Sequence, residues 1–332
     1  MSNASGFQLP LFEEVVDQKT ETNHEGLENV VWSHSRRSTL EQCTRKYYYE
    51  YYGSNKKAAK GEPNKNELHF LKQLQNRYER TGSILHLVIG QYLKKAQKGD
   101  IWTLARLESW ATDIFLKDIA YSKAKHEPDE DPINSYPPTF LQEFYYSVGN
   151  AHGLCQESLE LMLQALRSFY NDTAFDHYRR NGINDNSLIE YPLKIKTLPC
   201  KVDGRLDLAF RDNLIYTIVD WKSGESDGGG DDSLQLAVYA LWAIEHYSCS
   251  PDTVRIYKAY LRGSNIVEFD IDDQILNVAR ARIIQDAERM AYMRSYGEAA
   301  LADAFSPCGH KSVCLLCPYR NICSDGRNFS ND

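Results

Sequence analysis

Hydrophobic residues recur at helical spacing through the first half of this chain and form strand-like runs in much of the second half. The helical spacing predicts helices over residues 38–52, 66–98, 102–120 and 139–180. The strand-like runs predict strands over residues 187–196, 201–211, 214–222, 253–261 and 265–270. Two more helices are predicted over residues 233–247 and 275–302. A helical half followed by β-β-β-α-β-β-α predicts an α/β fold with a mixed central sheet.

Caps and breakers set the limits of several predicted elements. Ser38, with Glu41 three residues later, matches a capping box at the start of the first helix. Thr-Gly-Ser at residues 81–83 predicts a break in the second helical region. The polar segment 127–138 and the glycine-rich segment 224–232 are predicted to be loops.

Length and composition are those of an ordinary globular protein. The chain has 332 residues, 42% hydrophobic and 25% charged, which suffices for one large domain with an insertion or for two smaller ones. It contains no run of about 18 apolar residues that would predict a membrane span, and its polar beginning lacks the apolar centre of a signal peptide. We therefore expect a soluble, cytoplasmic protein with a disordered lead-in over residues 1–27.

The net charge of −8 excludes a protein that coats nucleic acid indiscriminately, because such binding depends on Lys and Arg. A local basic groove remains compatible with it. Cations interleave with tyrosines early in the chain: Arg36, Arg37, Arg45, Lys46, Lys56, Lys57 and Lys60 with Tyr47, Tyr48, Tyr49, Tyr51 and Tyr52. This composition is typical of a channel for single-stranded nucleic acid. A Tyr-rich amphipathic helix that packs on the core explains these tyrosines equally well.

Two aspartates and a lysine lie on adjacent predicted strands. Asp207 ends Gly-Arg-Leu-Asp, and Asp220 and Lys222 form Asp-Trp-Lys on the next strand, where alternation places both on one face. Carboxylates suit Mg²⁺ or Mn²⁺, and the ammonium could orient a water or stabilise charge on a phosphate. Glu190 on the first strand is a weaker candidate for the same site. The alternative is an ordinary hairpin with surface charges.

The eight cysteines are distributed unevenly. Cys155, Cys200 and Cys249 stand alone in apolar or strand-like surroundings, as core thiols do. The other five comprise Cys43 near the start and four cysteines close to the end, Cys308, Cys314, Cys317 and Cys323. In a cytoplasmic protein such a group binds metal or stays reduced rather than forming disulfides.

Four motifs in the order found here resemble those of the PD-(D/E)XK nucleases, in particular the RecB-like branch of AddB and the CRISPR-associated RecB-like exonucleases. They are Gly82-x3-His86, Gly204-x2-Asp207, Asp220-x-Lys222 and Gln235-x3-Tyr239. The resemblance implies a restriction-endonuclease-like core. It also implies that His86, Asp207, Asp220 and the Trp221 backbone carbonyl bind Mg²⁺ or Mn²⁺, and that Lys222, Gln235 and Tyr239 act beside them.

The cysteine spacing Cys314-x2-Cys317-x5-Cys323, with Cys43 far upstream, resembles the iron-sulfur pattern of the same branch. The resemblance implies a [4Fe-4S] cluster that joins the two ends of the chain. The alternative is a local Zn²⁺ site made by Cys308, Cys314, Cys317 and Cys323. Thr44 departs from the pattern, because proline commonly follows the first cysteine.

The resemblance implies a metal-dependent DNA exonuclease that acts on single strands or DNA ends, in repair, recombination or anti-phage defence. The alternative function is a DNA-processing subunit of a larger complex, with a helicase or an integrase as partner. The implied organisation begins with a lead-in (residues 1–27) and an N-terminal helix with the first cluster cysteine (28–66). A helical region with the metal-binding histidine and an insertion follows (67–186). The chain then forms the nuclease core (187–302) and a cysteine-rich segment (303–332). Arg36, Arg37, Arg45 and Lys46 are the predicted DNA-binding residues.

Overall fold

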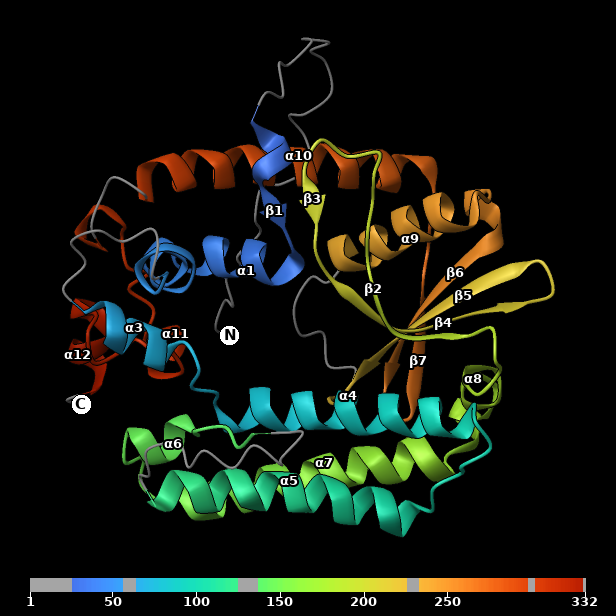
Figure 1. Ribbon diagram of the computed structural model, residues 1–332, viewed down its shortest axis with the longest axis horizontal. Coiled ribbons are helices and arrows are strands. Elements are labelled where there is room, and N and C mark those ends of the chain that lie inside the picture. The colour runs from blue at the N-terminus through green and yellow to red at the C-terminus, as the bar shows by residue number, and fades with distance from the viewer. Residues whose placement is uncertain (1–25, 56–63, 125–136, 226–232, 298–301, 331–332) are drawn as a thin grey trace, which may run out of the picture.

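A five-stranded sheet forms the centre of the protein in this computed structural model, which describes residues 26–55, 64–124, 137–225, 233–297 and 302–330 (Figure 1). The strands follow the order β2-β4-β5-β6-β7, with bounds Leu188–Pro192, Arg205–Asp212, Ile215–Lys222, Val254–Tyr260 and Asn265–Phe269. The pair β5–β6 is parallel and the other pairs are antiparallel. The prediction of a mixed sheet in an α/β fold is confirmed.

Helices cover both faces of this sheet (Figure 1). On one face lie α9 (Ser233–Tyr247) and α10 (Asp273–Gly297), and on the other lies α4 (Arg77–Ala96) with α5 (Leu104–Ala124) and α7 (Ala151–Asn171) behind it. Successive strand side chains point to opposite faces, so Ile218 and Val219 enter different hydrophobic cores. A helix on each face explains why five consecutive residues of β4 and five of β5 are buried, whichever face they point to.

The first predicted helix is wrong in both its start and its continuity. Helix α1 (His34–Gln42) begins earlier, because Ser33 rather than Ser38 accepts the capping hydrogen bond, from the backbone NH of Arg36. The extended backbone of Cys43, with φ −162°, then ends it. The chain continues as α2 (Thr44–Tyr48) and a π-helical turn, η2 (Tyr49–Gly53).

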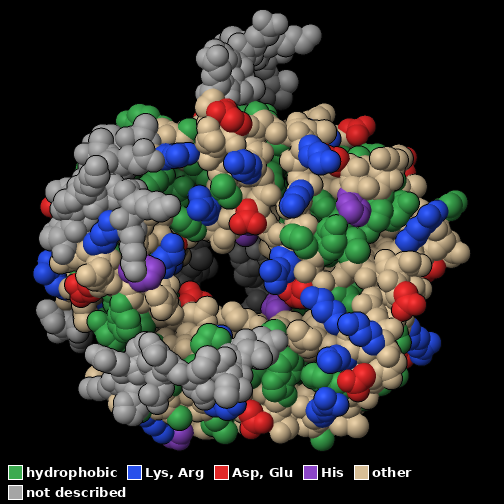
Figure 2. All heavy atoms as spheres, in the orientation of Figure 1, with side chains coloured by type: hydrophobic (Ala, Val, Ile, Leu, Met, Phe, Trp, Pro, Cys, Tyr) green, Lys and Arg blue, Asp and Glu red, His purple; other side chains and the backbone are tan. Residues whose placement is uncertain are grey.

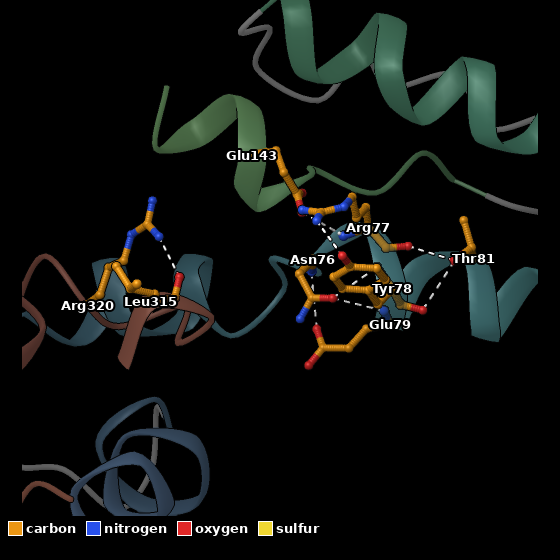
Figure 3. A network of polar contacts seen from close by, with 8 residues as sticks. All are labelled: Asn76, Arg77, Tyr78, Glu79, Thr81, Glu143, Leu315 and Arg320. Atoms are coloured by element: carbon orange, nitrogen blue, oxygen red, sulfur yellow. Dashed lines mark hydrogen bonds and ion pairs between the residues drawn. The ribbon is translucent and has the colours of Figure 1, made fainter. Parts of the chain in front are cut away.

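The second helical region breaks at a different place from the one predicted. Helix α3 (Lys65–Leu71) ends before residue 76, and α4 runs uninterrupted through residues 81–83. Asn76 accepts hydrogen bonds from the backbone NH groups of Tyr78 and Glu79, and the Glu79 carboxylate accepts one from the NH of Asn76 (Figure 3). This capping box fixes the start of α4.

The long helix predicted over residues 139–180 is four separate pieces. They are α6 (Gln142–Tyr145), α7, the short turn η3 (Thr173–Phe175) and α8 (Asp176–Gly182). The break before α7 occurs where Ser147 and Asn150 adopt positive φ angles of 52° and 55°, which a helix interior does not allow.

The remaining elements agree more closely with the sequence. Helix α9 has the predicted bounds, and β6 and β7 form the predicted hairpin. The predicted run over residues 201–211 is divided into β3 (Lys201–Val202), which pairs with β1 (Val31–Trp32), and β4. Short 3-10 turns occupy Leu27–Asn29, Pro251–Thr253 and Ala302–Ala304. Helix α10 is described from Asp273 to Gly297, and residues 298–301 of the predicted helix lie outside the described ranges.

The cysteine-rich end folds back onto the beginning of the chain (Figure 1). Its helices α11 (Lys311–Leu315) and α12 (Ser324–Ser330) are short, and the Ser306 carbonyl accepts hydrogen bonds from the backbone NH of Arg45 and the hydroxyl of Thr44. No helix in the described ranges is long and apolar enough to cross a membrane. Lys56, Lys57, Lys60, residues 1–25 of the lead-in and most of the two predicted loops lie outside those ranges.

Candidate active site and cysteine pocket

Two neighbouring strands bring Asp207 and Asp220 together. The antiparallel register pairs Leu208 with Val219, so that Asp207 and Asp220 follow as the next opposed positions of β4 and β5. Both are buried, with exposed fractions of 8% and 3%. Asp207 Oδ2 accepts a hydrogen bond of 2.7 Å from the backbone NH of Trp221, which fixes the orientation of its carboxylate. The hairpin thus creates a buried pair of acids.

Helix α4 supplies His86 to this pair from across the sheet face. Its Nδ1 lies 3.0 Å from Asp207 Oδ1, although the two residues are far apart in the chain. Burial by itself would lower the pKa of His86, but the carboxylates of Asp207, Asp220 and Glu190 outweigh it and raise the pKa to about 9. The structure therefore brings together His86, Asp207 and Asp220 as predicted.

Lys222, Tyr239 and Gln235 converge on Asp220. The Lys222 ammonium lies 2.7 Å from Asp220 Oδ2, and the Tyr239 hydroxyl donates a hydrogen bond of 3.1 Å to Oδ1. The Gln235 amide donates to the Tyr239 oxygen at 2.8 Å. Gln235 and Tyr239 lie one turn apart on α9, and their hydrogen bonds form a chain that ends on the Asp220 carboxylate.

The electrostatics of the site favour a bound cation. Burial and then the charge of Asp207 raise the pKa of Asp220, against the opposing effects of Lys222 and His86. Burial, Asp220 and Asp207 also raise the pKa of Tyr239 far above its usual range, so that its phenol stays protonated as a donor. Buried carboxylates in such proximity are stabilised by a positive ion between them.

The residues present fit a divalent metal ion. Among the described residues, buried Asp220 Oδ2 has no polar partner other than the Lys222 ammonium, at 2.7 Å. Ligand atoms of His86, Glu190 and Asp207 all lie within 4.8 Å of one another. Carboxylate oxygens with one imidazole are a suitable set for a hard or borderline divalent cation. The role predicted for the Trp221 carbonyl stays a prediction.

Glu190 was only a weaker candidate from the sequence, yet the structure places it at the site. Burial, and then the charge of Asp207, raise the pKa of its carboxyl group. A single sequence carried little signal for it, because a lone Glu on a strand is usually a solvent-facing residue. One hint of its position lies in the sequence, because Gly90 follows His86 by one helical turn and so leaves space beside the histidine.

A second cluster of ligand-type side chains lies at the other end of the molecule. Cys43, Cys308, Cys314, Cys317 and Cys323 line one pocket, together with Lys46 and Arg320. The Sγ atoms of Cys308 and Cys314 are 3.8 Å apart. Burial and the neighbouring thiols raise the pKa of Cys314 to about 12. The structure thus joins the distant Cys43 to the four C-terminal cysteines, and the iron-sulfur cluster itself stays a prediction.

The remaining cysteines are isolated from this pocket. Cys155 and Cys200 are buried, and burial raises the pKa of their thiols to about 12 and about 11. Cys249 is half-buried and its thiol points to the Ala243 carbonyl. All three fit the predicted role of core or packing thiols.

The predicted DNA-binding cations have partners within the protein. Arg45 bonds the Phe305 carbonyl, Arg37 contacts Asp286 at 3.3 Å and Lys46 contacts Glu50 at 3.8 Å. Arg36 lies 4.3 Å above the Tyr51 ring. The interleaved tyrosines are mostly buried, so the alternative of a helix packed on the core is right for Tyr47, Tyr48, Tyr49 and Tyr52. Contact of the four cations with DNA stays a prediction.

The chain matches a nuclease family model and is similar to two solved structures. The family model described as the PD-(D/E)XK nuclease superfamily matches residues 31–324. A solved structure from Eubacterium rectale described as a "putative exonuclease" shares 12% identity and a TM-score of 0.39, over 94% of this chain and 93% of that one. The structure of SSO0001 shares 18% identity and a TM-score of 0.26, over 52% and 78% of the respective chains. No curated protein sequence matches this one.

Proposed function

Because the chain belongs to the PD-(D/E)XK nuclease superfamily, we propose that it is a Mg²⁺- or Mn²⁺-dependent deoxyribonuclease that degrades single strands or DNA ends. The observation that carries this proposal is the convergence of His86 with Asp207, Asp220 and Lys222 from a helix and two strands. A structural ion pair alone would not explain four polar groups gathered at one buried place. Family membership supports the hydrolysis of phosphodiester bonds.

His86, Asp207 and Asp220 would hold the metal ion, with the Trp221 carbonyl as a further ligand. When bound, such an ion neutralises charge on the scissile phosphate and makes its water more acidic. Lys222, held by Asp220 at 2.7 Å, stabilises negative charge on the phosphate or orients the attacking water. Tyr239 and Gln235 keep the Asp220 carboxylate in an orientation in which it can contact both the metal ion and Lys222.

The recessed position of the acids supports a single-stranded substrate or a DNA end. Asp207 and Asp220 are almost fully buried, and one third of the His86 side chain is exposed, at 33%. Figure 2 shows a deep hollow in the middle of one face of the molecule, with acidic and basic side chains at its rim. A flexible strand can reach a recessed site more easily than an intact duplex can.

The cysteine pocket supports a [4Fe-4S] cluster held by Cys43, Cys314, Cys317 and Cys323. Four thiolates on one Zn²⁺ lie roughly 3.8 Å apart, given Zn–S bonds of about 2.3 Å. The pair Cys308–Cys314 has that spacing, but within the described ranges no three thiol sulfurs lie within 4.8 Å of one another. The presence of Cys43 in this pocket favours a cluster that joins both ends of the chain over a zinc site local to the C-terminal cysteines. Iron and zinc analysis with a visible spectrum of anaerobically purified protein distinguishes the two.

A helicase or an integrase is the proposed partner class, and the cytoplasm the proposed location. The sequence contains no G-x-x-x-x-G-K-[ST] motif for ATP-driven unwinding. A partner would then supply single strands to the site.

Incubation with end-labelled single- and double-stranded DNA and Mn²⁺ tests the proposed activity. We expect shortening of single strands and no cleavage by Asp220→Asn, a variant of nearly equal volume. Equal cleavage by the variant, or none by the wild type on any DNA, contradicts the proposal. Product lengths with label at the 5′ or the 3′ end give the direction of degradation.

A further inference from the structure

Glu190 has an unusual backbone for the middle of a strand. Its φ angle is +50°, while the residues on either side pair normally with β4, Ile189 with Leu208 and Tyr191 with Leu206. The same register places Glu190 opposite Asp207. A positive φ is unfavourable for a residue with a long side chain and persists only where the surroundings enforce it.

Helix α4 is adapted to the Glu190 side chain. A Cβ atom at Gly90 would lie 2.7 Å from Glu190 Cγ, closer than real carbon atoms approach. Glycine within a helix is less stable than alanine, so its presence here provides space for the glutamate. Gly90 lies one turn after His86 and therefore on the same side of the helix. One helix face thus carries both the histidine and the space for the acid.

The Glu190 carboxylate lies near His86 and Asp207 on one side and a surface arginine on the other. One of its oxygens lies within 4.8 Å of ligand atoms of both His86 and Asp207. Its other polar contact is Arg205, at 3.4 Å, whose side chain is 66% exposed and so is largely solvated. Two oxygens on opposite sides of one Mg²⁺ lie about 4 Å apart. The observed separations therefore match a shared ion or an ion reached through one water.

We infer that Glu190 is a further metal-binding residue of this site, acting on the ion directly or through one of its waters. The inference rests on the proposed function and extends the set of His86, Asp207 and Asp220. With His86 neutral, as a metal-binding imidazole must be, the carboxylates of Glu190, Asp207 and Asp220 and the Lys222 ammonium leave two negative charges, which one divalent cation balances.

Calorimetric titration of the full chain with Mn²⁺ tests this inference without relying on activity. Glu190→Gln keeps the length of the side chain and removes its charge, and we expect the Mn²⁺ affinity to fall at least about tenfold. Arg205→Gln, the matched control, removes the other member of the surface ion pair and leaves the affinity within about twofold. Wild-type affinity in Glu190→Gln overturns the inference while leaving the proposed function intact. Absence of Mn²⁺ binding by the wild type overturns both.

Glycine variants separate metal binding from backbone strain. Glu190→Gly accepts the positive φ, so without metal its melting temperature should be no lower than that of the wild type, while Mn²⁺ binds more weakly. Gly90→Ala should weaken Mn²⁺ binding in the wild type, because the new methyl group displaces the glutamate. The same change in a Glu190→Gly background should have no further effect on affinity. If Gly90→Ala and Glu190→Gly each lower the Mn²⁺ affinity and the two losses add in the double variant, Gly90 does not act by providing space for Glu190.

Discussion

The metal centre and the cysteine pocket are built in opposite ways. The centre takes Asp207 and Asp220 from two paired strands, and its acids are fixed by strand register and by hydrogen bonds from Trp221 and Tyr239. The pocket takes its thiols from a helix cap at Cys43 and from a segment with only two short helices, of five and seven residues. Helices of this length are unstable alone. The fold therefore makes the first site in advance, whereas the second would depend on the proposed iron-sulfur cluster for local order.

The two regions nevertheless contact each other through helix α6. Just after α6, the Tyr146 hydroxyl donates to the Pro318 carbonyl, and the Arg320 guanidinium lies 3.8 Å from the centre of its ring. Glu143 of α6 accepts hydrogen bonds from the backbone and side chain of Arg77, the first residue of α4 (Figure 3). Since α4 carries His86, the cysteine segment supports the start of the helix that completes the metal centre.

Loss of the Lys222 charge should have the largest effect on cleavage and none on the cysteine pocket. In Lys222→Met we expect cleavage to fall about 10²–10³-fold, because charge on the phosphate loses its stabilising ammonium. Mn²⁺ binding, iron or zinc content and melting temperature should stay near wild-type values. Lys201→Met, at an exposed position on β3, is the matched control. Loss of Mn²⁺ binding in Lys222→Met would show that the lysine supports metal binding and would contradict its role in catalysis.

Removal of one pocket thiol should produce the reverse pattern. In Cys314→Ser we expect loss of the bound iron or zinc and, near the C-terminus, at least about tenfold faster proteolysis, because that segment opens locally. The Mn²⁺ affinity of the metal centre should change much less. Cys249→Ser, outside the pocket, should behave as the wild type does. Unchanged metal content in Cys314→Ser would contradict the assignment of the pocket.

The Tyr239 hydroxyl should have an intermediate effect on cleavage. Tyr239→Phe removes the hydrogen bond of 3.1 Å to buried Asp220, so the carboxylate loses a fixed orientation. We expect a reduction of about 5–30-fold in kcat, equivalent to ~1–2 kcal/mol, with the fold retained. Steady-state kinetics at saturating Mn²⁺ measure it, and Tyr247→Phe on the same helix is the control. An unchanged kcat would leave Gln235 and Tyr239 with a packing role only.

The link between the regions should give the smallest effect. Arg320→Leu removes the cation that lies over Tyr146, an interaction of about 0.5–1 kcal/mol, equivalent to about a 2–5-fold change. We expect Mn²⁺ affinity at the metal centre to fall by that factor. Arg327→Leu in α12 serves as the control. An affinity identical to that of the wild type would show that the two regions are energetically independent.

The sequence predicted those features that depend on local pattern or on recognisable motifs. The strand-like run of β5 and the apolar helix pattern of α9 predicted these elements correctly, and the motifs predicted His86, Asp207, Asp220 and Lys222 as site residues. Spacing alone did not predict the contact of His86 with Asp207, because it depends on how α4 packs across the sheet.

Other features depend on backbone conformations and contacts that no local pattern specifies. The positive φ angles of Ser147 and Asn150 divided a predicted helix, and that of Glu190 placed a carboxylate at the site. The capping box of Asn76 and Glu79 was present in the sequence, but the glycine and serine at residues 82 and 83 suggested a break in the wrong place. Packing of the helix overrode these weak breakers.

Anomalous scattering from a crystal of the protein soaked in Mn²⁺ tests the central claim most directly. The account predicts one strong manganese peak within bonding distance of a His86 ring nitrogen and of carboxylate oxygens of Asp207 and Asp220, and no such peak in Asp207→Asn. A peak elsewhere, or bound Mn²⁺ that touches none of these three side chains, would contradict it.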